Sequence, residues 1–109
     1  MSYSKIVNTD ADIGHKIRVS IIVPIFNPNK TLFTKTINAL LQQTLKDIEI
    51  ILVNDASTSQ EATDILNEYK ACSNITIITH QINKHAGGAC NTGISSAKGE
   101  FVVLCAQDD

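Results

Sequence analysis

Acidic side chains follow two of the most apolar stretches of the sequence. Asp55 comes soon after Ile50–Val53, and Asp108 and Asp109 come soon after Phe101–Cys105. In open α/β sheets, ligands bind outside the carboxyl ends of parallel strands, near the point where the strand order reverses. Carboxylates at such ends could accept a hydrogen bond from a nucleobase or bind Mg²⁺ or Mn²⁺, which prefer oxygen ligands. These residues therefore indicate a nucleotide or metal site at one edge of a sheet.

Each acidic position also has an interpretation without a ligand. Asp55 lies in an Asp-x-Ser turn, so it could instead cap the helix that follows. Asp108 and Asp109 repel each other unless solvent or a cation relieves the repulsion, so they could form a solvated acidic turn. The sequence has no Gly-x-Gly-x-x-Gly after its first apolar run and no Gly-Lys-Ser/Thr phosphate loop. A bound phosphate would therefore be held mainly by a metal.

The histidines and cysteines form no metal-binding motif. The three cysteines are far apart, and the sequence has no Cys-x-x-Cys or Cys/His cluster. His85 precedes an expected helix and could approach a phosphate, although a lone loop histidine is usually solvated, and nothing in the pattern singles out His80. Cys90 and Cys105 are expected in the core, because free cysteine is among the most buried residue types.

Four β-branched runs alternate with helical patterns. The expected strands are Val19–Ile25, Ile48–Val53, Ile75–Thr79 and Phe101–Cys105. The expected helices are Leu32–Gln43, a second that begins with a capping box of Thr58 and Glu61, and a third near Ala86–Lys98 with Gly99 as a stop signal. Near-continuous apolar strands favour a parallel sheet covered on both faces. The alternation therefore predicts an α/β fold with helices on both sides of a mainly parallel sheet.

The third expected helix has small residues on one face. The residues on this face are Ala86, Ala89, Cys90, Ile94 and Ala97. Small side chains let a helix approach its neighbour closely, so this helix is expected to lie unusually near the sheet.

Length and charge narrow the class of protein. A chain of 109 residues can bury one small core. A net charge of −2 is not typical of proteins that bind nucleic acid. The sequence has no apolar run of the roughly 20 residues that a transmembrane helix needs. Residues 1–17 form an expected N-terminal extension without the apolar core of a signal peptide, which predicts a cytoplasmic chain.

Five motifs, in order along the chain, resemble those of family 2 glycosyltransferases. The stretch VSIIVPIFN at 19–27 resembles the family's opening strand, V-S-I/V-I/V-I/V-P-x-Y/F-N. The stretch EIILVNDAST at 49–58 resembles E-I/L-I-I/V-V-D-D-G-S-T. The remaining three are LLQQT at 40–44, NKHAGGACNTG at 83–93 and GEF at 99–101, which are similar to S-I/L-L-x-Q-T, N-x-G-x-x-x-A-R-N-x-G and G-E-Y/F. The resemblance covers about residues 18–109.

This resemblance implies a Rossmann-like, three-layer α/β/α arrangement, the nucleotide-binding half of the GT-A fold. It also implies an inverting, metal-dependent transfer from a nucleoside-diphosphate sugar, most often a UDP-sugar, to an acceptor sugar, lipid or polysaccharide. The cofactor would be Mn²⁺ or Mg²⁺, and a full-length protein could work at the inner face of the membrane. Carried over by position, the residues lining the base and ribose pocket would be Pro24, Ile25, Phe26 and Asn27. Asp55 would bind the base, Asp108 the nucleotide sugar, and Asp108 with Asp109 the metal-diphosphate.

The chain departs from the family pattern at several positions. Asn54 and Ala56 replace an Asp and a Gly, and Ala106 replaces the first acidic residue of D-x-D-D. His85 and Cys90 replace a Gly and an Arg, which removes a candidate cation near the diphosphate. In the family, the acceptor-binding half and the general base lie beyond the metal motif. The chain is therefore expected to be a fragment that is inactive alone.

Two other classes of protein remain as alternatives. A sugar-phosphate nucleotidyltransferase shares this architecture, but it needs a glycine-rich basic loop where this chain has PIFNPN at 24–29. A flavodoxin-like or receiver-like binding module is the non-enzymatic alternative. A receiver needs an acidic pair, a phosphoacceptor Asp and a Lys after three different strands, and here the acidic pair comes last.

Overall fold

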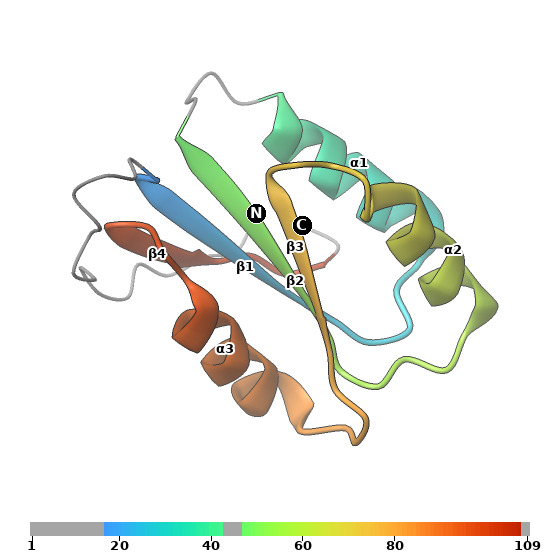
Figure 1. Ribbon diagram of the computed structural model, residues 1–109. Coiled ribbons are helices and arrows are strands. Elements are labelled where there is room, and N and C mark those ends of the chain that lie inside the picture. Colours follow the sequence, from blue (N-terminus) through green and yellow to red (C-terminus); the bar gives the residue numbers. More distant parts are fainter. Residues whose placement is uncertain (1–16, 43–46, 108–109) are drawn as a thin grey trace.

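The computed structural model describes residues 17–42 and 47–107. The strands in this part are β1 (Val19–Ile25), β2 (Ile48–Asn54), β3 (Ile75–Thr79) and β4 (Phe101–Leu104). The helices are α1 (Lys30–Leu41), α2 (Gln60–Tyr69) and α3 (His85–Ser96), and they alternate with the strands (Figure 1). The predicted order of elements is confirmed. The predicted extension 1–17 lies outside the described residues, apart from Ile17.

The four strands form one parallel sheet in the order β3-β2-β1-β4. Ile21 of β1 is in register with Ile50 of β2, and Val19 of β1 is in register with Phe101 of β4. The predicted parallel pairing is therefore confirmed. The chain moves outward from β1 to β3 and then returns to place β4 on the other side of β1. The strand order thus reverses between β1 and β4, which is where this architecture binds ligands.

Two apolar clusters form a layer on each face of the sheet. One cluster packs α1 and α2 against the sheet through Phe33, Ile37 and Ile65, among others. The other packs α3 against the opposite face and includes Ile22 and Ala89. Figure 1 shows α1 and α2 together on one side of the sheet and α3 on the other. The expected three-layer α/β/α arrangement is confirmed.

The predicted capping box at the start of α2 is wrong. The N-cap is Ser59, whose hydroxyl accepts a hydrogen bond from the backbone N–H of Ala62 at 3.1 Å. Thr58 lies one residue before the cap, and the Glu61 carboxylate accepts from the backbone N–H of Lys30 at 3.4 Å instead. Glu61 therefore links the starts of two helices rather than closing a box on its own.

Glycine at position 93 lets α3 lie close to the sheet. A Cβ atom built on Gly93 would overlap Cγ2 of Ile22 and lie 3.0 Å from its Cδ1. Ala89, one turn earlier, is buried in the same contact. The predicted close approach is confirmed for this part of the helix face.

A buried carboxyl group on β2 anchors the connection from α3 to β4. Glu49 is only 8% exposed, and its Oε2 accepts from the Ser20 hydroxyl at 2.5 Å and from the backbone N–H of Lys98 at 2.7 Å. The backbone N–H of Gly99 donates to the Ser20 hydroxyl at 2.8 Å. The prediction that Gly99 stops the helix is wrong, because α3 ends at Ser96 and Gly99 has no positive φ. Glycine is needed for space, since a Cβ there would lie 2.7 Å from the Ser20 hydroxyl.

Two departures from the family pattern lie at strained backbone positions. Ala56 has φ 63° and His85 has φ 64°, both in the left-handed region that favours glycine. This conformation costs a non-glycine residue about 1–2 kcal/mol. Replacement by glycine would remove this cost. Part of the resulting gain in stability is lost, because the greater freedom of glycine in the unfolded chain costs about 0.4–1 kcal/mol.

We therefore expect Ala56→Gly and His85→Gly each to raise the free energy of unfolding by about 0.5–1 kcal/mol, measured by urea denaturation. Ala39→Gly, at an exposed position inside α1, is the control and should lower it by about 1 kcal/mol. A loss of stability in Ala56→Gly comparable to that of the control would contradict the expected strain.

Candidate functional site

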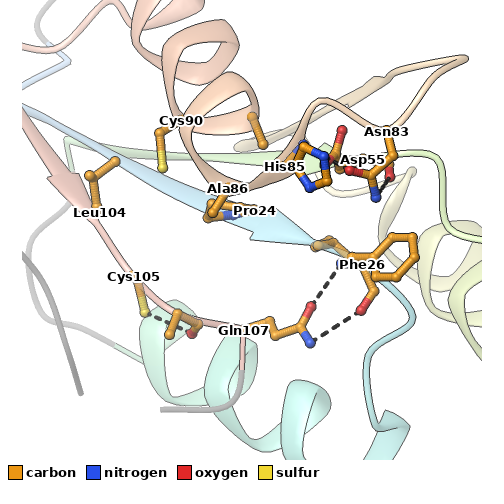
Figure 2. Close-up of a pocket in the computed structure, with 13 residues that line it drawn as sticks. Pro24, Phe26, Asp55, Asn83, His85, Ala86, Cys90, Leu104, Cys105 and Gln107 are labelled. Atoms are coloured by element: carbon orange, nitrogen blue, oxygen red, sulfur yellow. Dashed lines mark hydrogen bonds between the residues drawn. The ribbon is translucent and has the colours of Figure 1, made fainter.

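A cavity of about 840 Å³ opens at the carboxyl ends of β1 and β4 (Figure 2). Its walls come from residues 24–26 of the β1 end, residues 104–107 of the β4 end, Asp55 after β2, and the start of α3. This volume is within the range of sites for small molecules and cofactors. The cavity thus lies where the strand order reverses, and it includes the predicted Pro24, Ile25, Phe26 and Asp55.

Pro24 explains why the sheet parts at this point. Alternate residues of β1 present their backbone to β4: the N–H of Phe101 donates to the Arg18 carbonyl oxygen at 3.0 Å, and that of Cys105 to the Ile22 carbonyl oxygen at 2.9 Å. Pro24 is the next residue in this series, and proline has no N–H to offer a neighbouring strand. The pairing of β1 with β4 ends at Ile22. The gap between the two strand ends is therefore built into the sequence of β1.

Gln107 joins the two strand ends on the far side of this gap. Its amide oxygen accepts from the backbone N–H of Phe26 at 3.0 Å, and its amide nitrogen donates to the Phe26 carbonyl oxygen at 3.4 Å (Figure 2). The side chain thus replaces a backbone pairing that β4 no longer provides. The sequence analysis missed Gln107. The available signal was an amide, with one donor and one acceptor group, just beyond the last strand.

Asp55 is buried and takes part in a network of hydrogen bonds. It is 3% exposed, and its Oδ1 accepts from His80 Nδ1 at 2.9 Å and from the backbone N–H of Lys84 at 2.7 Å. Burial acts to raise the pKa of the Asp55 carboxyl, but its interactions with His80 and with the backbone N–H groups of Lys84 and His85 together outweigh it, so the pKa lies below its usual value. Asp55 does not cap α2, because Ser59 does so. Its carboxylate instead supports the start of α3.

Because the pKa of Asp55 is lower in the folded chain than in the unfolded chain, its contribution to stability is present above the unfolded value of about 3.9 and is lost as the pH falls through the folded value. We expect the free energy of unfolding to fall with acidification more steeply in the parent than in Asp55→Asn. Urea denaturation at a series of pH values measures the two slopes. Equal slopes for Asp55→Asn and the parent would contradict the lowered pKa.

His80, which contacts Asp55, is the second residue around the cavity that the sequence analysis missed. It follows β3 directly and is 8% exposed. Its Nδ1 lies 2.9 Å from Asp55 Oδ1, and its Nε2 lies 2.8 Å from the Thr92 hydroxyl on α3. The signal was its place at the carboxyl end of a strand, the same signal that identified Asp55.

Asn27 lies against the start of α2 rather than in the cavity. Its side-chain oxygen accepts from the backbone N–H groups of Thr58 at 2.8 Å and Ser59 at 3.0 Å. The backbone N–H of Asn27 donates to the Ser57 hydroxyl at 3.0 Å. Asn27 has φ 43°, a left-handed conformation that asparagine tolerates better than most residues. The side chain predicted to line the base pocket thus holds the β1–α1 and β2–α2 loops together.

The start of α3 presents His85 and Cys90 to the cavity (Figure 2). His85 is exposed, as predicted, and its backbone N–H donates to the Asn83 side-chain oxygen at 2.8 Å. The expectation that Cys90 belongs to the core is wrong, because Ala89 occupies the sheet-facing position and leaves Cys90 half-buried at the cavity wall. Burial raises the pKa of the Cys90 thiol, which keeps it protonated at neutral pH. Cys105 is buried in the core, as expected.

The predicted metal ligands Asp108 and Asp109 lie outside the described residues. Within residues 17–42 and 47–107, no group of three or more His, Cys, Asp or Glu side chains could hold a metal ion. The Asp55 carboxylate and the Gln107 amide already have hydrogen-bond partners in the protein. The metal site therefore remains a prediction that depends on the acidic pair.

No helix in the described part of the chain is long and apolar enough to cross a membrane.

Comparison with known proteins identifies the family. The family model for glycosyl transferase family 2 matches residues 20–109. Glycosyltransferase GlyG of Streptococcus pneumoniae is 40% identical over 94 residues, which are 84% of this chain and 30% of GlyG. The UDP-Glc:alpha-D-GlcNAc-diphosphoundecaprenol beta-1,3-glucosyltransferase WfaP of Escherichia coli is 38% identical over 91 residues, 84% of this chain and 35% of WfaP.

Solved structures agree with this assignment. The crystal structure of S. aureus TarS 1-349 in complex with UDP superimposes with a TM-score of 0.73 at 28% identity, over 84% of this chain and 27% of that one. The chain thus spans about a third or less of the length of these relatives. The parallel sheet, its flanking helices and the matched motifs correspond to the N-terminal region of the GT-A fold. The chain belongs to glycosyl transferase family 2.

Proposed function

We propose that this chain binds the donor of a glycosyltransferase that transfers a sugar from a UDP-sugar to an acceptor hydroxyl. The observation that carries the proposal is the buried Asp55 carboxyl, held by His80 and Lys84, in a cavity at the point where the strand order reverses. The UDP complex of TarS and the UDP-Glc donor in the name of WfaP support it.

The cavity has the chemistry that a uracil base needs. The imide N–H of uracil is a donor, and an ionised carboxylate only accepts hydrogen bonds. The lowered pKa keeps the Asp55 carboxyl ionised at neutral pH. Pro24, Ile25 and Phe26 line the same cavity, and Phe26 is 47% exposed, so it offers apolar surface to a planar ring. In this proposal the base lies between the end of β1 and Asp55.

The proposed reaction is a single displacement with inversion at the anomeric carbon. The acceptor oxygen forms a bond to this carbon as the bond to the diphosphate oxygen breaks, and a general base takes the proton of the acceptor hydroxyl. The Asp55 carboxylate already accepts hydrogen bonds from His80 and Lys84, so it is suited to bind the nucleobase rather than to take the proton of the acceptor hydroxyl. We place the general base and the acceptor site in the rest of a longer protein, and we expect this chain alone to be inactive.

We assign a divalent cation, Mn²⁺ or Mg²⁺, to Asp108 and Asp109. They follow Gln107, which lines the cavity, and hard cations prefer carboxylate oxygens. When bound, the cation would offset the negative charge that develops on the leaving diphosphate. Two carboxylates cannot complete its coordination shell, so diphosphate oxygens and water would supply the other ligands.

We expect the chain to bind UDP more tightly in Mn²⁺ than in EDTA, and to bind uridine equally in both, because only UDP offers diphosphate oxygens to the cation. Isothermal titration calorimetry measures both affinities, and GDP tests the choice of base. Asp108→Ala should remove the Mn²⁺ effect on UDP, while Asp64→Ala, an exposed carboxylate on α2, should retain it. Equal UDP affinity in Mn²⁺ and EDTA would reject the metal site, and no UDP binding would reject the donor site.

A further inference from the structure

His80 connects the carboxylate that we assign to the base with two other elements. It follows β3, it contacts Asp55 after β2 at 2.9 Å, and it contacts Thr92 on α3 at 2.8 Å. Both side chains of the His80–Asp55 pair are almost completely buried, with exposed fractions of 6% and 5%. A buried histidine bonded at both ring nitrogens has one orientation available to it.

The directions of these hydrogen bonds follow from the partners. A carboxylate only accepts, so His80 Nδ1 carries the hydrogen that faces Asp55. With the hydrogen on Nδ1, Nε2 of the imidazole carries a lone pair and accepts the single hydrogen of the Thr92 hydroxyl, 2.8 Å away. The Thr92 hydroxyl also lies 3.1 Å from the Gly88 carbonyl oxygen, one turn back in α3, but its one hydrogen can go to only one of these acceptors at a time. Thr92 thus holds the ring so that Nδ1–H points at Asp55.

Two donors meet on one oxygen of the Asp55 carboxylate. His80 Nδ1 and the backbone N–H of Lys84 both donate to Oδ1, at 2.9 and 2.7 Å. Rotation of the carboxylate would break both bonds, so they fix its plane. Because both oxygens lie in the plane of the carboxylate, the two bonds to Oδ1 also fix the direction of the other oxygen, Oδ2.

We propose that His80 is a positioning residue for base recognition, and that it holds Asp55 with Oδ2 toward the imide N–H of the uracil ring. The inference rests on the proposed donor site. It adds a specificity role, because a fixed, ionised oxygen suits the donor at N3 of uracil and repels the lone pair at N3 of cytosine. Loss of the His80 donor would leave Oδ1 with Lys84 alone, and the carboxylate could turn or take up a proton. Either change would reduce the preference for uracil.

A matched pair of substitutions separates the two ring nitrogens. The side-chain nitrogen of asparagine can replace Nδ1 of histidine, and that of glutamine can replace Nε2. We expect His80→Gln to weaken UDP binding about tenfold, the effect of losing one hydrogen bond to a charged group, and His80→Asn to stay within about threefold of the parent. The ratio of UDP to CDP affinity should fall in His80→Gln and be retained in His80→Asn. Calorimetry with the two nucleotides measures both quantities.

Equal losses in His80→Asn and His80→Gln, or a loss in His80→Gln that is the same for UDP and CDP, would overturn the positioning role and leave His80 a structural residue. If His80→Gln does not fold, the Nδ1 proton of His80 in the parent provides the test: its NMR signal should shift on saturation with uridine, and an unchanged signal would overturn the role. Failure of the parent to bind UDP would reject the donor site itself. If the parent binds UDP but His80→Asn weakens this binding as much as His80→Gln does, only the role of His80 would be rejected.

Discussion

Asp55→Asn is expected to weaken UDP binding by about 10- to 100-fold, because a hydrogen bond to a charged group contributes about 1.5–3 kcal/mol and each 1.4 kcal/mol is tenfold in affinity. In the parent, the N–H groups of His80 and Lys84 both donate to Oδ1 of Asp55. In the variant, only the amide oxygen of the asparagine can accept these two hydrogen bonds. The amide nitrogen must then take the place of Oδ2. A donor would face the imide N–H of uracil, which is also a donor.

The same substitution should change the choice of base. Cytosine has a lone pair at N3, so the new amide N–H₂ could donate to it, and the variant is expected to favour CDP over UDP where the parent favours UDP. Calorimetry with both nucleotides measures the ratio. The enhancement of UDP binding by Mn²⁺ should be unchanged, since Asp55 is not an assigned metal ligand. Equal UDP affinity in the variant and the parent would leave Asp55 only its structural role at the start of α3.

Gly93→Ala is expected to lower the free energy of unfolding by about 2 kcal/mol, a typical cost of adding a methyl group to a packed core. The new Cβ would overlap Cγ2 of Ile22, which is fully buried in β1. Neither element can move freely, because β1 is paired on both sides and α3 is tied to it by the Ala89 contact. The same crowding would displace the start of α3 from the cavity.

Urea denaturation measures this cost, and Gly87 provides the matched control. A Cβ on Gly87, in the same helix, meets nothing within 4 Å, so Gly87→Ala should be neutral or stabilise by up to about 1 kcal/mol through helix propensity. In an Ile22→Ala background the cost of Gly93→Ala should shrink, because the overlapping methyl group is gone. Equal stability of Gly93→Ala and Gly87→Ala would show that the close approach does not limit the helix position.

The amino-acid sequence by itself determined the elements and the edge of the sheet that carries the site. Buried strands and amphipathic helices leave a periodic pattern over a few neighbouring residues, so β2 and α1 could be predicted to within two residues at each end. Asp55 was informative for a related reason, since its place in the site follows from its position directly after β2. The family motifs could also be identified from the sequence, because they depend only on residue type, order and spacing along the chain.

Only the tertiary structure decided which side chains meet. The His80–Asp55 bond joins residues 25 positions apart, and the Gln107–Phe26 bonds join residues 81 positions apart. Such pairs depend on the strand order, the register and the rotation of each side chain, and no local pattern records these. The same reason explains Asn27, a polar residue at the correct strand end whose side chain turned to the α2 loop. A one-dimensional pattern specifies where a polar group enters the site, but packing in three dimensions specifies its partner.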